Sequence, residues 1–125
     1  MTIPTGAAPH PASDISIVHK LYKFYLAFSV AAQSFPKQDR YTVAQRCENL
    51  SLEILELAIL AHGKEHRSKI LILGKMDVKL KLLKYLVRAC HDIKAMNEKR
   101  YLYFEGMLQE IGRMLGGWIK STNAK

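Results

Sequence analysis

The strongest constraint on the fold of this chain is a repeated spacing of apolar residues by three and four positions. Such spacing places apolar side chains along one side of an α-helix, whereas a half-buried strand alternates apolar and polar residues. Four long segments show the helical spacing, and no segment shows a sustained alternation. The sequence therefore predicts an all-α protein.

Residues that interrupt helices separate the four segments. Phe35-Pro36 follows the first segment, His62-Gly63 follows the second, and the third ends around Asn97 to Lys99. Proline suits the opening turn of a helix because it has no N–H to donate, and glycine readily takes the left-handed conformation that closes one. We expect the first helix over about Ile15 to Ser34, and we expect the second to open at Pro36 and to close at Gly63.

Each expected helix has one apolar seam that should face a common core. Four amphipathic helices joined by short loops predict an antiparallel up-down four-helix bundle with axes inclined by ~20°. We assign residues 15–121 to this bundle, residues 1–14 to a flexible N-terminal tail and residues 122–125 to a C-terminal tail. In chain order, the seams are Val18, Leu21, Tyr25, Phe28 and Ala32; Val43, Cys47, Leu50, Ile54 and Leu57; Leu73, Met76, Leu80, Leu83, Val87 and Cys90; and Phe104, Leu108, Ile111, Leu115 and Trp118.

The third helix carries a second apolar stripe beside its core seam. A helix that faces a single core needs an apolar arc of little more than ~100°, and surplus apolar surface favours association. We therefore predict an oligomer interface on this helix. The alternative is that the third helix is central and contacts both neighbours through the stripe. The predicted interface residues are Leu71, Val78, Leu82, Tyr85 and Ala89, with Met96 continuing the stripe.

Positive charge is concentrated in and just before the same helix. The chain has 19 Lys and Arg against 11 Asp and Glu, a net charge of +8, and residues 64–88 contribute +6 of it. Such a field suits a polyanion such as nucleic acid, or an acidic protein. The alternative is a solvated face that keeps the protein soluble. We expect nucleic-acid contacts from Lys20, Lys23, Lys64, Arg67, Lys69, Lys81, Lys84 and Arg88, the last three sharing one helix face and repelling one another.

The motifs that catalysis or cofactor binding would require are missing. We find no phosphate-binding GxxxxGK[ST], no GxGxxG, no H-E-x-x-H and no nucleophile elbow. His62 and His66 have a ligand-like spacing, but Gly63 lies between them, so we expect no metal site. Cys47 and Cys90 fall in apolar seams and are expected to be inert core thiols. We expect no catalytic residue, no cofactor, no small-molecule substrate and no enzyme activity.

Three features bear on the cellular location. Apolar runs such as residues 70–73 are far shorter than the ~20 residues of a membrane-spanning helix. The N-terminal residues lack the basic start and apolar stretch of a signal peptide. Two cysteines do not make a disulfide framework. We therefore expect a cytoplasmic protein that does not enter a membrane.

Gly116-Gly117 lies near the end of the fourth segment, directly before Trp118. Glycine permits both unusual backbone angles and close contact between backbones. We expect this pair to mark a close backbone approach or a break in the helix, because no phosphate-binding motif surrounds it.

Two motifs resemble the ends of a known protein family. FPKQDRY, residues 35–41, opens the second helix, and EIGRMLGGWIK, residues 110–120, closes the fourth. With the seams between them, the chain from about Ile17 to Ser121 resembles a family of small four-helix bundles. That family contains Avd, the accessory variability determinant protein of diversity-generating retroelements, and proteins encoded in intervening sequences of ribosomal RNA.

The resemblance implies a non-enzymatic role. Avd-like proteins are barrel-shaped homopentamers with a positively charged surface; they bind the reverse transcriptase of the element and its RNA, and support mutagenic cDNA synthesis and retrohoming. The implied partners are therefore the polymerase, RNA, with DNA as a further candidate, and further copies of the chain. The alternative is an intervening-sequence type of protein with a structural or interaction role and no polymerase partner. Arg40 and Arg113 match the family motifs; we interpret them as tying helix ends to carboxylates, with partner contact as the alternative.

Overall fold

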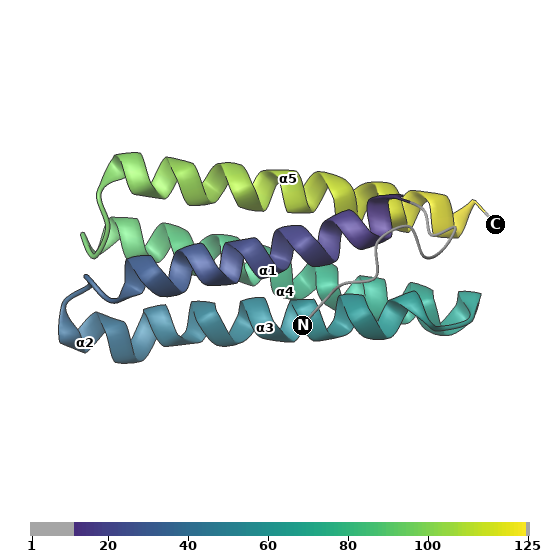
Figure 1. Cartoon of the computed structure of the whole chain (residues 1–125), viewed down its shortest axis with the longest axis horizontal. Helices are drawn as coiled ribbons and strands as arrows, with labels where there is room; N and C mark the ends of the chain where they lie inside the picture. The colour runs from purple at the N-terminus through teal and green to yellow at the C-terminus, as the bar shows by residue number, and fades with distance from the viewer. Residues whose placement is uncertain (1–11, 125) are drawn as a thin grey trace.

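The computed structural model describes residues 12–124, and every regular element in this range is a helix (Figure 1). The elements are α1 (Ala12–Ala32), α2 (Lys37–Asp39), the π-helical turn η1 (Arg40–Ala44), α3 (Gln45–His62), α4 (His66–Asp92) and α5 (Glu98–Asn123). The short α2 and η1 lead directly into α3 and form one long helical segment with it. The predicted all-α fold with four long helical segments is confirmed.

The four long helices run alternately up and down around one core (Figure 1). The main contacts of α1 are with α3 and α5, and those of α4 are also with α3 and α5, so α1 and α4 stand diagonally opposite. Each helix therefore lies beside its neighbours in the sequence, as an up-down bundle requires. The start of α1 and the end of α5 lie at the same end of the bundle as the α3–α4 turn.

The core follows the predicted seams most closely in the second half of the chain. Every predicted seam residue of α4 and α5 is buried. The other two seams are buried in part: Val18 and Tyr25 of α1, Val43 of η1 and Leu57 of α3 are only partly buried, and the remaining seam residues are buried. The two later helices therefore obey a regular helical period, and the two earlier ones depart from it.

An aromatic cluster fills the core between the second half of α1 and the start of α5. Phe24 is fully buried although it was not in the predicted seam. Its ring stacks on Phe28 with centroids 5.7 Å apart and meets Phe104 edge to face, also at 5.7 Å. Phe28 and Phe104 pack edge to face at 5.2 Å. Offset and edge-to-face pairs of this kind add about 0.5–1.5 kcal/mol each beyond the burial of area.

The π-helical turn η1 explains why the seam of the second helical segment shifts. A π turn has one residue more than an α turn, so the residues that follow it rotate relative to those before it. The hydroxyl of Thr42 donates to the carbonyl oxygen of Gln38 at 2.8 Å inside this stretch. Ala44 is fully buried as a result, in place of the predicted Val43.

The two ends of the second helical segment differ from what was expected of Pro36 and Gly63. Pro36 caps α2 with extended backbone angles (φ −52°, ψ 142°), so it precedes the first turn and does not form part of it. Gly63 ends α3 with φ −97°, not with a left-handed φ. The Lys64 N–H donates to the Ala61 carbonyl oxygen, three residues earlier, at 3.2 Å. This hydrogen bond closes the turn without a positive φ. Among residues 12–124, the left-handed residue is Lys94, with φ 66°, between α4 and α5.

Both predicted explanations for Gly116-Gly117 are wrong. Helix α5 passes through the pair without a break. A Cβ atom built on either glycine would meet no atom within 4 Å, so no backbone approaches closely. Gly116 and Gly117 are both exposed, so α5 has no side chains at this part of its surface.

Helical structure extends beyond the predicted bundle limits at both ends. Helix α1 begins at Ala12 and α5 continues to Asn123, so residues 12–14 and 122–123 are not tails. Thr122 is 5% exposed and belongs to the packed part of α5. The rest of the expected N-terminal tail and Lys125 lie outside the described residues. None of the helices within residues 12–124 has the length and apolar character needed to cross a membrane.

Candidate interaction surfaces

The eight basic residues expected to contact nucleic acid fall in three separate places. Three lie at the α3–α4 turn and the start of α4, three lie in the second half of α4, and two lie on α1. Arg67 and Arg88 are 21 residues apart on α4, which separates them by about 32 Å along the axis. The three groups are Lys64, Arg67 and Lys69; Lys81, Lys84 and Arg88; and Lys20 and Lys23.

The α1 lysines do not extend the basic face of α4 directly, because α5 lies between the two helices. Lys84 borders one flank of α5, since its Nζ lies 3.0 Å from the place of a Cβ on Gly112. Lys20 borders the other flank, near Glu110. Arg113 and Lys20 both lower the pKa of the Glu110 carboxyl, the larger effect being the hydrogen bond from Arg113. A ligand that contacts both lysines must therefore cross α5.

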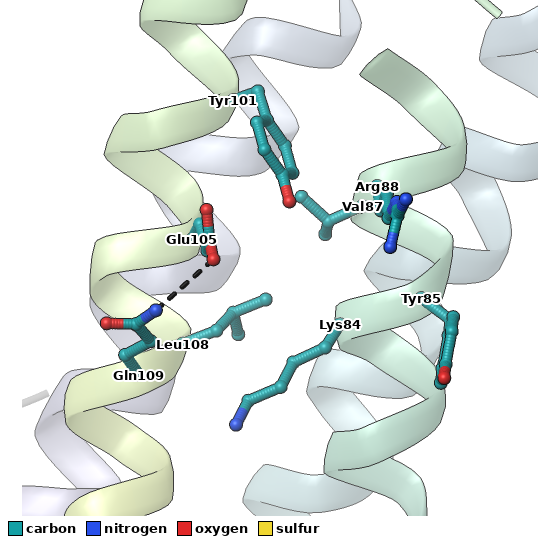
Figure 2. Close-up of a pocket in the computed structure, with 8 residues that line it drawn as sticks. All are labelled: Lys84, Tyr85, Val87, Arg88, Tyr101, Glu105, Leu108 and Gln109. Carbon is teal, nitrogen blue, oxygen red and sulfur yellow. Dashed lines mark hydrogen bonds between the residues drawn. The ribbon is translucent and has the colours of Figure 1, made fainter. Parts of the chain in front are cut away.

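A pocket of about 240 Å³ opens between α4 and α5 beside the second basic group (Figure 2). Lys84 reaches from α4 towards α5, and Tyr101, Glu105 and Gln109 come from α5. Two cations and one carboxylate line the pocket, so its net charge is positive. The lining residues are Lys84, Tyr85, Val87, Arg88, Tyr101, Glu105, Leu108 and Gln109.

The basic residues around this pocket are less mutually repulsive than their spacing predicts. Lys81 Nζ lies 2.9 Å from Asp77 Oδ2, and Arg88 Nε lies 3.7 Å from Asp92 Oδ2. Lys84 has no ion pair among residues 12–124. Exposed pairs of this kind contribute only about 0–1 kcal/mol, so an incoming phosphate can exchange with either carboxylate. Lys84 needs no such exchange.

Tyr101 forms the upper edge of the pocket and is held by a neighbouring ring. Its phenol ring stacks on His91 with centroids 4.8 Å apart and planes inclined by 19°. Burial raises the pKa of the Tyr101 hydroxyl, so it stays protonated at neutral pH and can donate a hydrogen bond. The neighbouring Glu105 accepts from Gln109 Nε2 at 3.2 Å. The pocket therefore presents donors from both helices.

The second apolar stripe of α4 lies on the outside of the bundle. Leu71, Val78 and Tyr85 are 65%, 67% and 71% exposed, and Leu82 is 40% exposed. These four residues, which we name the α4 stripe, are therefore not the contacts of a central helix with its two neighbours. The alternative, in which the third helix is central and contacts both neighbours through the stripe, is therefore wrong for these four residues.

Two residues of the predicted stripe behave differently. Ala89 is partly buried on α4. Met96 is 5% exposed and lies beyond the end of α4, in the turn to α5. Met96 belongs to the core because the chain leaves the helical path at Asp92, so a projection that continues the helix misplaces it.

A groove of about 560 Å³ runs between the α4 stripe and α3. Its wall on the α3 side is fixed by ion pairs: Glu53 lies 2.7 Å from Lys79 Nζ and 3.7 Å from Arg46 Nη1. Gly74 lines the groove, and a Cβ there would meet no atom within 4 Å. The groove thus has an apolar floor and a basic rim, and it is lined by Arg46, Leu50, Leu71, Gly74, Lys75, Val78, Lys79 and Leu82.

A family model described as bAvd-like matches residues 15–122. The chain belongs to the bAvd-like family. The match covers all four long helices and hence both the α4–α5 pocket and the α4 stripe. The family is one of accessory proteins and is not known for enzyme activity. No curated protein matches the chain. The predicted relation to proteins of ribosomal RNA intervening sequences stays a prediction.

The two arginines of the family motifs have different partners in this bAvd-like chain. Arg113 donates from Nε to Glu110 Oε2 at 3.2 Å within α5, so its predicted carboxylate partner is confirmed. Arg40 lies over the ring of Tyr41 at 5.5 Å from the centroid. The tie between helix ends comes from Arg100, which donates to the Ser34 hydroxyl at 3.2 Å. Sequence spacing could not identify that pair, because the residues are 66 positions apart.

Both cysteines of the bAvd-like chain are fully buried and free, as the seams predicted. The hydrogen bond with Cys90, together with burial, raises the pKa of the Cys47 thiol. Cys47 therefore stays protonated and is a poor nucleophile. Within residues 12–124, no group of three His, Cys, Asp or Glu side chains is placed to hold a metal ion.

Proposed function

We propose that this bAvd-like protein is the accessory protein of a diversity-generating retroelement. It would hold template RNA and the reverse transcriptase of the element, while the polymerase performs the mutagenic cDNA synthesis that leads to retrohoming. The observation that carries this proposal is the family match over residues 15–122. The positively charged pocket between α4 and α5 supports it, because a polyanionic partner would find donors there on two helices.

RNA contact would be made through phosphates in the α4–α5 pocket. Lys84 has no acidic partner among the described residues, and Arg88 has a long, exposed pair that a phosphate can replace. Single-stranded nucleic acid releases counterions on binding, with a slope of about −0.7 per neutralised phosphate in a plot of log K against log salt. Two contacts in the pocket, from Lys84 and Arg88, and one beside it, from Lys81, would give a slope of about −2.

Self-association through the α4 stripe is the second part of the proposal. Four large apolar side chains are exposed together on one helix, and water contact with such a surface is unfavourable. The family resemblance extends this to a barrel-shaped homopentamer in the cytoplasm that binds the polymerase. Each copy in such an assembly would offer its own α4–α5 pocket to the RNA.

Binding of a fluorescent single-stranded RNA at 50 and 200 mM salt tests the RNA contact. We expect the double variant Lys84→Glu, Arg88→Glu to lose at least tenfold in affinity. The matched control is Lys37→Glu, Lys99→Glu, which changes the charge equally at two exposed positions away from the pocket. Equal losses in both variants would show that only the net charge matters, and an unchanged affinity of the pocket variant would refute the site.

Capture of the polymerase tests the partner. The chain is expressed with the reverse transcriptase encoded beside its gene, and the complex is washed at low and then at high salt. We expect stable capture that high salt weakens. Absence of capture at low salt would contradict the retroelement role and would favour a bundle of the intervening-sequence type.

A further inference from the structure

The α4–α5 pocket contains one carboxylate, that of Glu105, among its basic residues. This group would weaken a pocket that bound phosphate alone, because like charges repel. The carboxylate is not the partner of the pocket arginine either, since Arg88 pairs with Asp92. Its position therefore favours a ligand that carries hydrogen-bond donors as well as phosphate.

The lysine amine and the carboxylate lie at different levels of α5. Lys84 Nζ lies 3.0 Å from the place of a Cβ on Gly112, so the lysine reaches α5 at that level. Gly112 follows Glu105 by seven positions in the helix, which corresponds to about 10 Å along its axis. The pocket thus has the Lys84 cation at one end and the Glu105 acceptor towards the other (Figure 2).

Gln109 orients the carboxylate and adds a donor beside it. Its Nε2 donates to Glu105 Oε1 at 3.2 Å. An amide nitrogen has two N–H groups and a carboxylate has about four acceptor sites, so this hydrogen bond uses one N–H and one acceptor site. The Glu105–Gln109 pair therefore presents a charged acceptor and a neutral donor side by side.

The size and lining of the pocket suit one unpaired base. Its volume of about 240 Å³ lies below the ~300–1,000 Å³ of typical small-molecule pockets. Val87 and Leu108, each 1% exposed, give it an apolar base, and Tyr101 borders it at one end (Figure 2). A space of this size admits a single base and excludes a base pair.

The four RNA bases differ in how well they match the Glu105–Gln109 pair. Guanine carries two adjacent donors, N1–H and N2–H, which one carboxylate accepts together, and its O6 accepts from an amide N–H. Adenine and cytosine each offer one amino group beside one ring acceptor, and uracil offers one N–H beside a carbonyl. Guanine therefore makes three hydrogen bonds with the pair, whereas each of the other bases makes two.

We propose that the α4–α5 pocket binds one guanine nucleotide, with the base edge on Glu105 and Gln109 and a phosphate on Lys84. This inference rests on the proposed RNA contact and adds a base preference to it. Proteins recognise RNA sequence mostly through unpaired bases, whose edges are free to form hydrogen bonds. The guanine is either an unpaired residue of RNA or a free nucleotide, because both carry the same base edge and a phosphate.

A carboxylate that contacts guanine and a carboxylate that only repels phosphate respond differently to mutation. In the first case, Glu105→Gln removes the acceptor for N1–H and N2–H, so the affinity for guanine falls. In the second case, the same variant removes a repulsive charge, so the affinity for every RNA rises. The sign of the change therefore separates base recognition from a simple effect of charge.

Binding of three single-stranded RNAs tests the proposal. The probes are fluorescent oligouridines whose central residue is guanosine, inosine or adenosine, and inosine lacks the N2 amino group of guanosine. The parent protein should bind the guanosine probe about tenfold more tightly than either of the others, since one fewer hydrogen bond to a charged group is made with them. In Glu105→Gln, the affinity for the guanosine probe should fall until this preference is lost.

Glu56→Gln is the matched control, because it removes the same charge from an exposed position on α3, away from the pocket. This variant should keep the guanosine preference, and circular dichroism confirms that both variants are helical. Equal binding of the three probes by the parent protein would overturn the guanine site. A gain in affinity for all three probes in Glu105→Gln would also overturn it. The proposed RNA contact is tested separately, by the loss of affinity in Lys84→Glu, Arg88→Glu.

Calorimetric titration of the parent protein with GMP and with AMP distinguishes the two sources of guanine. Binding of GMP in preference to AMP would support the site and would include the free nucleotide among its ligands. A preference for the guanosine probe without binding of GMP would support the site as one for a residue within an RNA strand. Equal binding of GMP and AMP would contradict recognition of the base.

Discussion

Replacing the bare glycines of α5 by alanine should stabilise the protein. Gly106, Gly116 and Gly117 all lie within α5, and a Cβ on any of them would meet no atom within 4 Å. Alanine in an exposed helix interior is favoured over glycine by about 0.8–1 kcal/mol because glycine loses more backbone entropy. The triple variant should therefore gain about 2.5 kcal/mol in the free energy of unfolding.

Urea unfolding followed by fluorescence measures this gain. Trp118 is the only tryptophan of the chain and is 3% exposed, so its emission reports the loss of packing around α5. With a slope of about 1.5–2 kcal/mol/M for a chain of this size, the midpoint should rise by about 1–2 M. Gly63→Ala is the control, because Gly63 also has free space for a Cβ but lies outside the helix interior.

Two outcomes would refute the reasoning. A lower midpoint for the triple variant would mean that the glycines are required for packing, contrary to the free space around them. An equal gain from Gly63→Ala would mean that helix propensity is not the cause. Gly112→Ala is a separate case, since its Cβ would lie 3.0 Å from Lys84 Nζ. That variant should displace the lysine and weaken RNA binding while the fold is kept.

Three further predictions concern the core, one ion pair and the thiols. Phe104→Ala should lower the free energy of unfolding by about 3–5 kcal/mol, because its buried ring contacts both Phe24 and Phe28; urea unfolding checks this, and a loss below about 1 kcal/mol would contradict the cluster. Arg113→Gln should raise the pKa of Glu110, which the hydrogen bond from Arg113 holds below its ordinary value. Because folding lowers the pKa of the Glu110 carboxyl, the ion pair with Arg113 stabilises the fold at a pH above the pKa of Glu110 in the unfolded chain. This stabilisation is lost as the pH falls through the pKa of Glu110 in the folded protein. An NMR titration in which Arg113→Gln leaves the pKa of Glu110 unchanged would contradict the prediction. Cys47 and Cys90, both fully buried, should react with a thiol reagent at the rate of unfolding, and rapid reaction in the native protein would show that the seam opens.

The seams of α4 and α5 could be predicted fully because their core-facing apolar residues keep one helical period from end to end, even though α4 carries a second apolar stripe on its outer side. Helix α1 was harder, since apolar residues surround it: Phe24 is buried, yet Tyr22 and Leu26 are exposed. Periodicity alone does not decide which side of such a helix faces the core. The π turn before α3 was missed for a related reason, because a constant period was assumed through residues 40–44.

The candidate site depended on neighbours that spacing does not reveal. Lys20 and Lys23 were expected beside the basic face of α4, but the fold inserts α5 between them. Tyr101 and Gln109 became part of the pocket only because α4 and α5 pack together. One signal was present in the sequence and was overlooked: Asp77 precedes Lys81 by four residues and Asp92 follows Arg88 by four, the spacing at which helical ion pairs form.

The placement of the chain ends has a practical meaning for any cyclic assembly. Because four antiparallel segments separate them, the first residues of α1 and the last of α5 emerge at one end of the bundle (Figure 1). A cyclic ring relates its subunits by rotation alone, so equivalent ends of all copies share one rim. A fluorescent tag fused behind the end of α5 would decorate that rim once per subunit and would leave the rim formed by α2 and the α4–α5 turn uncovered. Counting such tags would give the subunit number without disturbing the contacts between copies.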